Sequence, residues 1–133
     1  MTGFAVDPVI ISLTHVIGDW PLSRAFLYDD SRYAWGLLVP RRPGVIEICD
    51  LVPEDQAQLT VEIVKLSRIV RALPGVEKLN VGNLGNLVPQ LHVHVIGRCK
   101  DDPAWPGPVW GHSDPVRYAP ATLEGRLSQM GLR

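Results

Sequence analysis

Several features that mark specialised classes of protein are scarce in this chain. Only two cysteines occur, Cys49 and Cys99, and they form no CxxC pair. This usage argues against a disulfide framework and favours a reducing cytoplasm. Basic residues do not cluster either, because the longest Lys/Arg run is Arg41-Arg42 and the net charge is −1. We therefore expect no nucleic acid among the binding partners.

Long apolar segments are also missing. The run "PVIISL" near the N-terminus is far too short to span a bilayer, so we expect no membrane association. The residues before it include an acid and no Lys or Arg, which is not the pattern of a signal peptide. The 133 residues, 46% of them hydrophobic and 20% charged, fit one soluble domain, residues 1–133, with a core that needs no crosslinks.

The periodicity of apolar residues predicts strands on both sides of one long helix. Residues 22–40 predict a hairpin that turns at Asp29–Arg32, and residues 45–48 predict a further short strand. Residues 9–20 are compatible with a short helix or a strand. From about Pro53 the period changes, and a stripe of apolar residues at steps of three and four predicts a helix that ends before Pro74-Gly75. That stripe consists of Leu59, Ile63, Leu66, Val70 and Leu73.

Two more strands are predicted after the helix, in residues 76–84 and 87–98, with glycines at the bend between them. This order of elements predicts an α+β fold: an antiparallel sheet with one long helix packed on one face. The final residues, 101–133, are rich in Trp and Pro and weakly helical at the end. We expect them to wrap over the sheet as a tail.

The strand "QLHVHVI" carries an unusual polar face. Side chains two residues apart on a strand point the same way, so Gln90, His92 and His94 are expected on one face and Leu91, Val93 and Val95 on the other. The apolar face suits the long helix. Buried imidazoles and amides need partners, because an unpaired one costs about 1–3 kcal/mol. We therefore expect the polar face to form the floor of a pocket.

Three interpretations of His92 and His94 are open at this point. They could belong to a half-exposed strand, or they could bind a metal ion together with a third ligand. No Asp or Glu lies between Val81 and Lys100 to supply that ligand, and His15 and His112 are distant in sequence. We therefore expect no metal or other cofactor. The third interpretation is catalysis on an anionic substrate.

The residues around the histidines favour the third interpretation. A neutral imidazole can attack phosphorus and form a covalent intermediate that water then opens. The amides of Asn83, Asn86 and Gln90 could hold phosphoryl oxygens, and the backbone N–H groups of the Gly-bearing loop 82–86 could add donors. A carboxylate near the site would repel a phosphate, and none occurs there. The predicted substrate is therefore a phosphate compound.

The motif and its context resemble the histidine triad (HIT) family, whose signature is His-φ-His-φ-His-φ-φ with φ apolar. "QLHVHVIGR" and "GLLVPRRPGVIEICDL" carry the resemblance, over about residues 22–100. It implies an α+β fold, a homodimer, and activity as a nucleotide hydrolase or nucleotidyl transferase. It also implies that His92 is the nucleophile, that His94 contacts phosphate, and that Asn83 is the polar residue on the phosphate side.

The chain departs from the family pattern in two places. The first triad position is Gln90, which can donate a hydrogen bond but cannot take up a proton. The segment that holds the ribose through an Asp in nucleotide-binding members has no counterpart, because "YAWGLLVPRR" runs straight through. A non-catalytic binding protein for nucleotides or phosphometabolites is therefore the alternative hypothesis.

Three residues beyond the motif have several possible roles. Trp105 and Trp110 could fix the tail to the sheet, form an aromatic wall over the pocket, or contact a second subunit. Arg98, just after the motif, is expected at the surface or in a dimer contact, with a phosphate contact as a further option.

Overall fold

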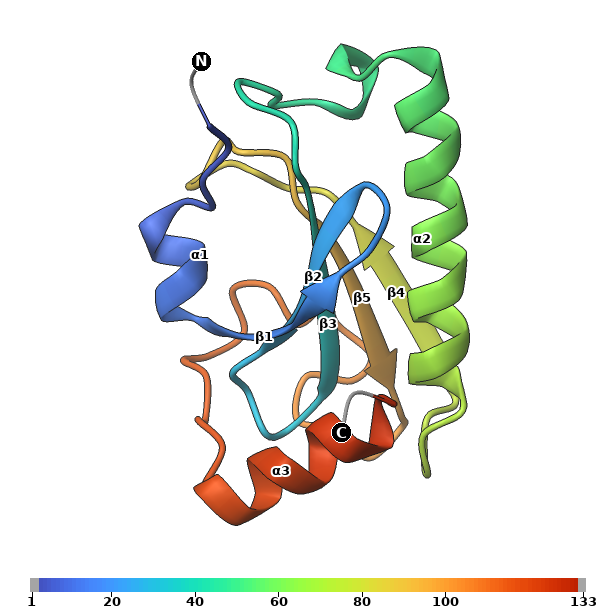
Figure 1. Ribbon diagram of the computed structural model, residues 1–133. Helices are drawn as coiled ribbons and strands as arrows, with labels where there is room; N and C mark the ends of the chain where they lie inside the picture. Colours follow the sequence, from blue (N-terminus) through green and yellow to red (C-terminus); the bar gives the residue numbers. More distant parts are fainter. Residues whose placement is uncertain (1–2, 132–133) are drawn as a thin grey trace.

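The computed structural model, which describes residues 3–131, contains one five-stranded antiparallel sheet in the order β1-β2-β3-β5-β4 (Figure 1). All four neighbouring pairs of strands run antiparallel, which confirms the expected α+β class. The strands are β1 Thr14–Asp19, β2 Ser23–Tyr28, β3 Ala34–Pro40, β4 Lys78–Gly82 and β5 Val93–Arg98.

The expected hairpin is confirmed as β2 and β3, joined by a turn that begins at Asp29. Residues 9–20 contain both elements that the sequence allowed, since helix α1 (Pro8–Ser12) is followed by β1. The strand expected at residues 45–48 is wrong. Residues 45–47 form no regular element, and a single 3-10 turn, η1 (Ile48–Asp50), begins at residue 48. The Asp50 carboxylate accepts from the Glu47 backbone N–H, so this segment satisfies that donor locally rather than through a sheet.

Helix α2 (Pro53–Arg71) confirms the predicted long helix and covers one face of the sheet. Its apolar stripe packs on the inward face of β5: Leu66 and Val70 join a cluster with Val95, and Leu59 joins one with Leu91 and Val93. The strand predicted over residues 87–98 begins only at Val93, because the residues before it pair with no strand. Leu91, Val93 and Val95 nevertheless all face the helix, as predicted. The histidines are consequently directed to the opposite face.

A buried acid of α2, which the sequence pattern did not reveal, fixes the helix to the sheet. Glu62 is 1% exposed, and its two carboxylate oxygens accept from the backbone N–H groups of Leu22 and Ser23 at 2.8 and 2.9 Å. These are the residues at which β2 begins. The carboxylate therefore satisfies buried backbone donors that the sheet leaves unpaired.

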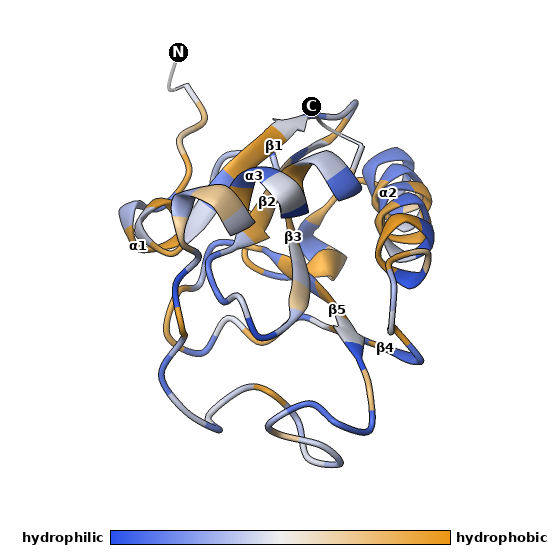
Figure 2. Ribbon diagram, turned by 90° about the horizontal axis from the view of Figure 1, so that it is seen from below, coloured by the Kyte–Doolittle hydropathy of each residue, from blue (hydrophilic) through white to orange (hydrophobic). Residues whose placement is uncertain are grey.

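The other face of the sheet is covered by α1 and by the tail. Figures 1 and 2 show α1 and α2 on opposite sides of the strands. In the tail, Ala104 and Val109 pack against Trp35 and Ile96 on the histidine side. Helix α3 (Pro120–Gln129), in contrast, lies at the α2 face and packs Leu127 into the cluster under α2, so the tail reaches both faces of the sheet. The expectation that the tail wraps over the sheet is confirmed.

The expectation that Arg98 lies at the surface is wrong, because this side chain is 2% exposed. Its guanidinium forms a two-point ion pair with Asp102, at 2.7 and 2.9 Å, and donates to the side chain of Asn80 and to the carbonyl of Gly107. Asp102 also accepts from three backbone N–H groups at the start of the tail, including that of Trp105. Arg98 is therefore a buried anchor for the tail.

None of the helices within residues 3–131 is both long and apolar enough to cross a membrane.

Candidate functional site

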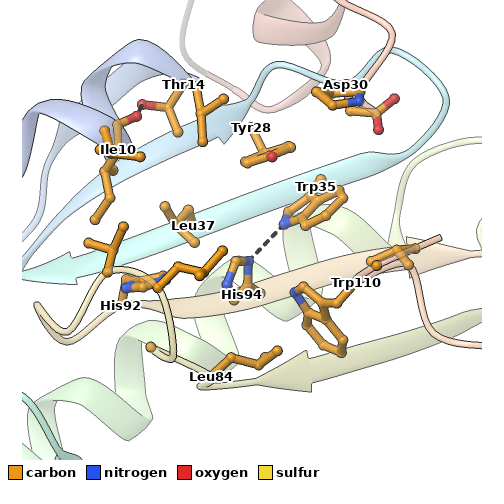
Figure 3. Close-up of a pocket in the computed structure, with 18 of the residues that line it drawn as sticks. Ile10, Thr14, Tyr28, Asp30, Trp35, Leu37, Leu84, His92, His94 and Trp110 are labelled. Carbon is orange, nitrogen blue, oxygen red and sulfur yellow. Dashed lines mark hydrogen bonds between the residues drawn. The ribbon is translucent and has the colours of Figure 1, made fainter. Parts of the chain in front are cut away.

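A cavity of about 530 Å³ opens on the face of the sheet that lies away from α2, and His92 and His94 are among its lining residues (Figure 3). One wall comes from α1 through Val9, Ile10 and Leu13, and another from the loop after β4. The tail closes a third side with Val109 and Trp110. The two histidines thus lie at the floor of a pocket, as their alternation on the strand predicts.

The orientation of His92 is fixed by a backbone carbonyl. Its Nδ1 lies 2.7 Å from the carbonyl oxygen of Gln90. A carbonyl oxygen only accepts hydrogen bonds, so Nδ1 carries the proton and donates. In the neutral ring Nε2 then holds the lone pair. An unprotonated ring nitrogen of this kind is what attack on phosphorus would require.

His94 has the opposite arrangement of its two nitrogens. The indole Nε1 of Trp35 donates to His94 Nδ1 at 3.0 Å, and an indole N–H can only donate. The proton of the neutral ring therefore lies on Nε2. Burial, reinforced by the nearby His92, lowers the pKa of His94 from 6.5 to about 3. His94 is consequently a neutral hydrogen-bond donor across the physiological pH range.

The two rings lie close enough to act on one group. Their centroids are 5.1 Å apart, with the planes at 70° to each other. One ring offers a lone pair and the other an N–H. A nucleophile with a neutral donor beside it can attack an electrophilic centre while the donor stabilises the oxygen that gains charge.

Comparisons with known proteins identify the family to which the chain belongs. Residues 12–101 match the model of the HIT domain, ten residues further toward the N-terminus than the resemblance in the sequence suggested. The chain belongs to the histidine triad family.

Three solved structures of HIT proteins are similar over nearly their whole length. One from Bradyrhizobium japonicum shares 42% identity over 98% of this chain and 97% of its own, with a TM-score of 0.94. One from Sinorhizobium meliloti shares 38% over 96% and 95%, with a TM-score of 0.93. One from Marinobacter aquaeolei shares 39% over 99% and 100%, with a TM-score of 0.90. A comparison with curated proteins gave no match.

Gln90, which the resemblance placed at the first triad position, does not line the cavity. Its side-chain oxygen accepts from the Asp7 N–H and its amide nitrogen donates to the Ala5 carbonyl, both at 2.8 Å. This geometry corrects the phosphate contact expected of Gln90. The side chain holds the segment before α1, while its carbonyl orients His92. Because any residue has that carbonyl, the support of His92 does not require a histidine here.

The two asparagines of the loop after β4 differ in position. Asn86 is exposed and lines the cavity. Asn83 follows β4 directly, is half-buried, and does not belong to the lining residues. The structure therefore brings Asn86 to the histidines' cavity and leaves Asn83 beside it.

Aromatic side chains that the motif does not include complete this HIT site. Tyr28 and Trp35, on neighbouring strands, stack at 4.1 Å between ring centroids and both line the cavity. Of the two tail tryptophans, Trp110 lines the cavity, whereas Trp105 lies over Arg98 with 5.6 Å from the guanidinium carbon to its ring centroid. The sequence placed Trp35 on a strand but did not show which strand lies beside it. The fold pairs that strand, β3, with β5 and so brings Trp35 next to His94.

Metal ligation was the second interpretation of the histidines. Among the residues that the structure describes, no group of three or more His, Cys, Asp or Glu side chains is arranged to hold a metal ion.

The low pKa of His94 predicts a specific pH dependence of stability. In the unfolded chain the pKa returns to about 6.5, so between pH 6.5 and 3 the unfolded state binds one more proton than the folded state. The free energy of unfolding should therefore fall as the pH drops through this range, by about 1 kcal/mol per pH unit.

Urea unfolding at pH 7, 6 and 5 measures this loss, with His94→Asn as the comparison. Asn keeps an acceptor for Trp35 but does not titrate, so the variant should lose less stability than the wild type between pH 6.5 and 5. If the free energy of unfolding changed equally with pH in the two proteins, the lowered pKa of His94 would be contradicted.

Proposed function

We propose that this HIT protein is a hydrolase or transferase that acts on the phosphorus of a nucleotide or phosphate ester through a covalent His92 intermediate. The observation that carries the proposal is the opposite proton placement on the two rings. The Gln90 carbonyl leaves the lone pair on His92 Nε2, and the Trp35 indole leaves the proton on His94 Nε2. HIT proteins are typically nucleotide-binding hydrolases or transferases, which supports this assignment.

The reaction has two steps in this proposal. In the first, the lone pair of His92 Nε2 forms a bond to phosphorus, and the leaving group departs with the electron pair of its own bond and takes a proton from water. His92 is then a cation, stabilised by the Gln90 carbonyl through Nδ1–H. In the second, water or an acceptor alcohol attacks phosphorus, releases its proton to solvent, and the electrons of the P–N bond return to Nε2.

His94 would stabilise both steps without exchanging a proton. Its Nε2–H donates to a phosphoryl oxygen as negative charge on that oxygen grows. The pKa of about 3 keeps the ring from becoming an acid at neutral pH. His92 and His94 therefore have separate roles, one as the nucleophile and one as the electrostatic stabiliser.

The walls of the cavity support a substrate with an apolar or aromatic part. Tyr28 and Trp35 provide a stacked aromatic surface, and α1 provides aliphatic side chains. Within residues 3–131 no Lys or Arg side chain lines the cavity, but one carboxylate, that of Asp30, does, which corrects the expectation that no acid lies near the site. Both oxygens of this carboxylate accept from the Arg32 guanidinium, which offsets its charge. Asn86, which does line it, remains a proposed phosphate contact, and Asn83 is proposed on the family resemblance.

Assembly and location belong to the same proposal. Family membership supports a homodimer. The two cysteines, Cys49 and Cys99, are both free, which fits a reducing cytoplasm.

The proposal is tested by turnover and by trapping the intermediate. We expect the full chain to hydrolyse at least one member of a panel of nucleoside phosphoramidates and dinucleotides. A phosphohistidine is hydrolysed in acid, so the reaction is quenched in base before analysis by mass spectrometry. A phosphoryl or nucleotidyl mass on the peptide that contains His92 supports the proposal. Binding of panel members without any turnover would overturn it in favour of the non-catalytic binding protein.

A further inference from the structure

The indole nitrogen of Trp110 is a buried donor without a partner. Its Nε1 has almost no accessible surface, and it forms no hydrogen bond within residues 3–131. Three other buried side-chain atoms share this property, on Ser23, Tyr33 and Arg41, but none of these residues lines the cavity. Native proteins pair nearly all such donors, so an unpaired donor at a site indicates an absent acceptor.

Trp110 is held beside His94 by close packing. The two rings are edge to face, with centroids 5.4 Å apart and planes at 77°. Figure 3 shows the indole nitrogen on the side of the ring that faces His94. The far edge of the indole lies on Gly82, where an added Cβ would come within 2.9 Å of Trp110 Cη2. Gly82 pairs with His94 in the sheet, so the missing side chain leaves the space that Trp110 fills.

His94 cannot accept the hydrogen of Trp110. Its Nδ1 already accepts from Trp35, and its Nε2 carries the remaining proton of the neutral ring. No described residue accepts from His94 Nε2. Two neighbouring neutral rings beside His92 therefore each carry an N–H group for which residues 3–131 provide no acceptor. The group that would satisfy both is an oxyanion.

We propose that the Trp110 N–H donates to a phosphoryl oxygen of the substrate together with His94 Nε2–H, and that the tail thereby completes the site. Trp110 lies beyond residue 101, where the match to the HIT domain ends. The stabilisation of the transferred group is consequently shared between the family motif and a segment outside it. This inference rests on the phosphoryl chemistry proposed for His92.

The first test follows the indole directly in the full-length, ¹⁵N-labelled protein. The chain has four tryptophans, and the Nε1–H resonance of Trp110 is assigned as the one missing from Trp110→Phe. Orthovanadate, an analogue of the phosphoryl-transfer transition state, and inorganic phosphate are the two probes. We expect orthovanadate to shift this resonance downfield, because a shielded N–H gains an anionic acceptor, and to leave that of Trp105 in place.

The outcomes separate this inference from the function on which it rests. Shifts of the backbone amides of His92 and His94 without a shift of the Trp110 indole would overturn the inference and leave the proposed function intact. An absence of any shift with either probe would overturn both. A shift of the Trp110 indole supports the inference even where no substrate of the panel is turned over.

The second test is kinetic. Trp110→Phe keeps an aromatic ring on Gly82 and removes only the donor, so kcat should fall by about 10–100-fold with a smaller change in KM. Trp105→Phe makes the same chemical change in the same tail but away from the cavity, and should stay within about twofold of the wild type. A kcat of Trp110→Phe within twofold of the wild type would contradict the inference. If Trp110→Phe raised KM and left kcat unchanged, the result would also contradict the inference, because looser packing weakens substrate binding without affecting the transition state alone.

Discussion

Replacement of His92 by Ala is expected to lower turnover by at least about a thousandfold, because the variant has no atom that can form the bond to phosphorus. The ring that would be lost is positioned by the Gln90 carbonyl and lies 5.1 Å from that of His94. His94 cannot take over as nucleophile, since its Nδ1 is bonded to the Trp35 N–H and its Nε2 carries the proton. The measurement is kcat with the best substrate of the panel.

His15→Gln is the matched control. His15 is paired with Asp29 and does not line the cavity, so its replacement should leave kcat unchanged. Added imidazole should restore part of the activity of His92→Ala, because the missing ring leaves a space of its own shape beside the phosphoryl site. A kcat of His92→Ala within tenfold of the wild type would exclude His92 as the nucleophile.

The largest expected effect on stability comes from Arg98→Met. Methionine keeps much of the aliphatic volume but leaves Asp102 as a buried carboxylate without its cation; the paired side chains are only 1% and 4% exposed. Breaking such a pair from one side costs about 3–5 kcal/mol, a large part of the 5–15 kcal/mol typical of a whole domain. We expect the thermal midpoint to fall by about 10 °C or more.

Arg24→Met provides the comparison. Arg24 also forms a two-point ion pair with an aspartate, Asp19, but these side chains are 35% and 46% exposed. Water screens this pair, so its loss should cost less than about 1 kcal/mol. Equal losses in the two variants would show that the buried Arg98 pair does not anchor the tail.

The sequence determined the secondary structure wherever the apolar period was clear and the turn residues were local. The stripe from Leu59 to Leu73 specified α2, and Asp29–Arg32 specified the hairpin turn, because each signal depends only on neighbouring residues. Residues 45–48 had a strand-like composition but no partner strand, and the local hydrogen bond of Asp50 decided their conformation. Strand pairing is a property of the whole sheet, which four residues do not encode.

The motif itself determined the family and the position of the two histidines. Alternation on a strand was enough to direct His92 and His94 to one face, away from α2. It was not enough for Gln90, which precedes the first residue of β5 and bonds to the segment before α1. His92 also precedes β5, by one residue, and still shares the cavity with His94, so the start of the strand does not by itself explain the difference. The side-chain hydrogen bonds of Gln90 to Ala5 and Asp7 hold it away from the cavity.

Tertiary structure alone decided which nitrogen of each histidine carries the proton and what surrounds the pair. Trp35 is 59 residues from His94, and Trp110 reaches the site from a tail that the Arg98–Asp102 pair fixes to the sheet. Such contacts join segments that are far apart in sequence, and their specificity comes from burial and geometry rather than from spacing. The sequence therefore determined that two histidines share a face, and the fold determined that His92 keeps its lone pair on Nε2 while His94 keeps its proton there.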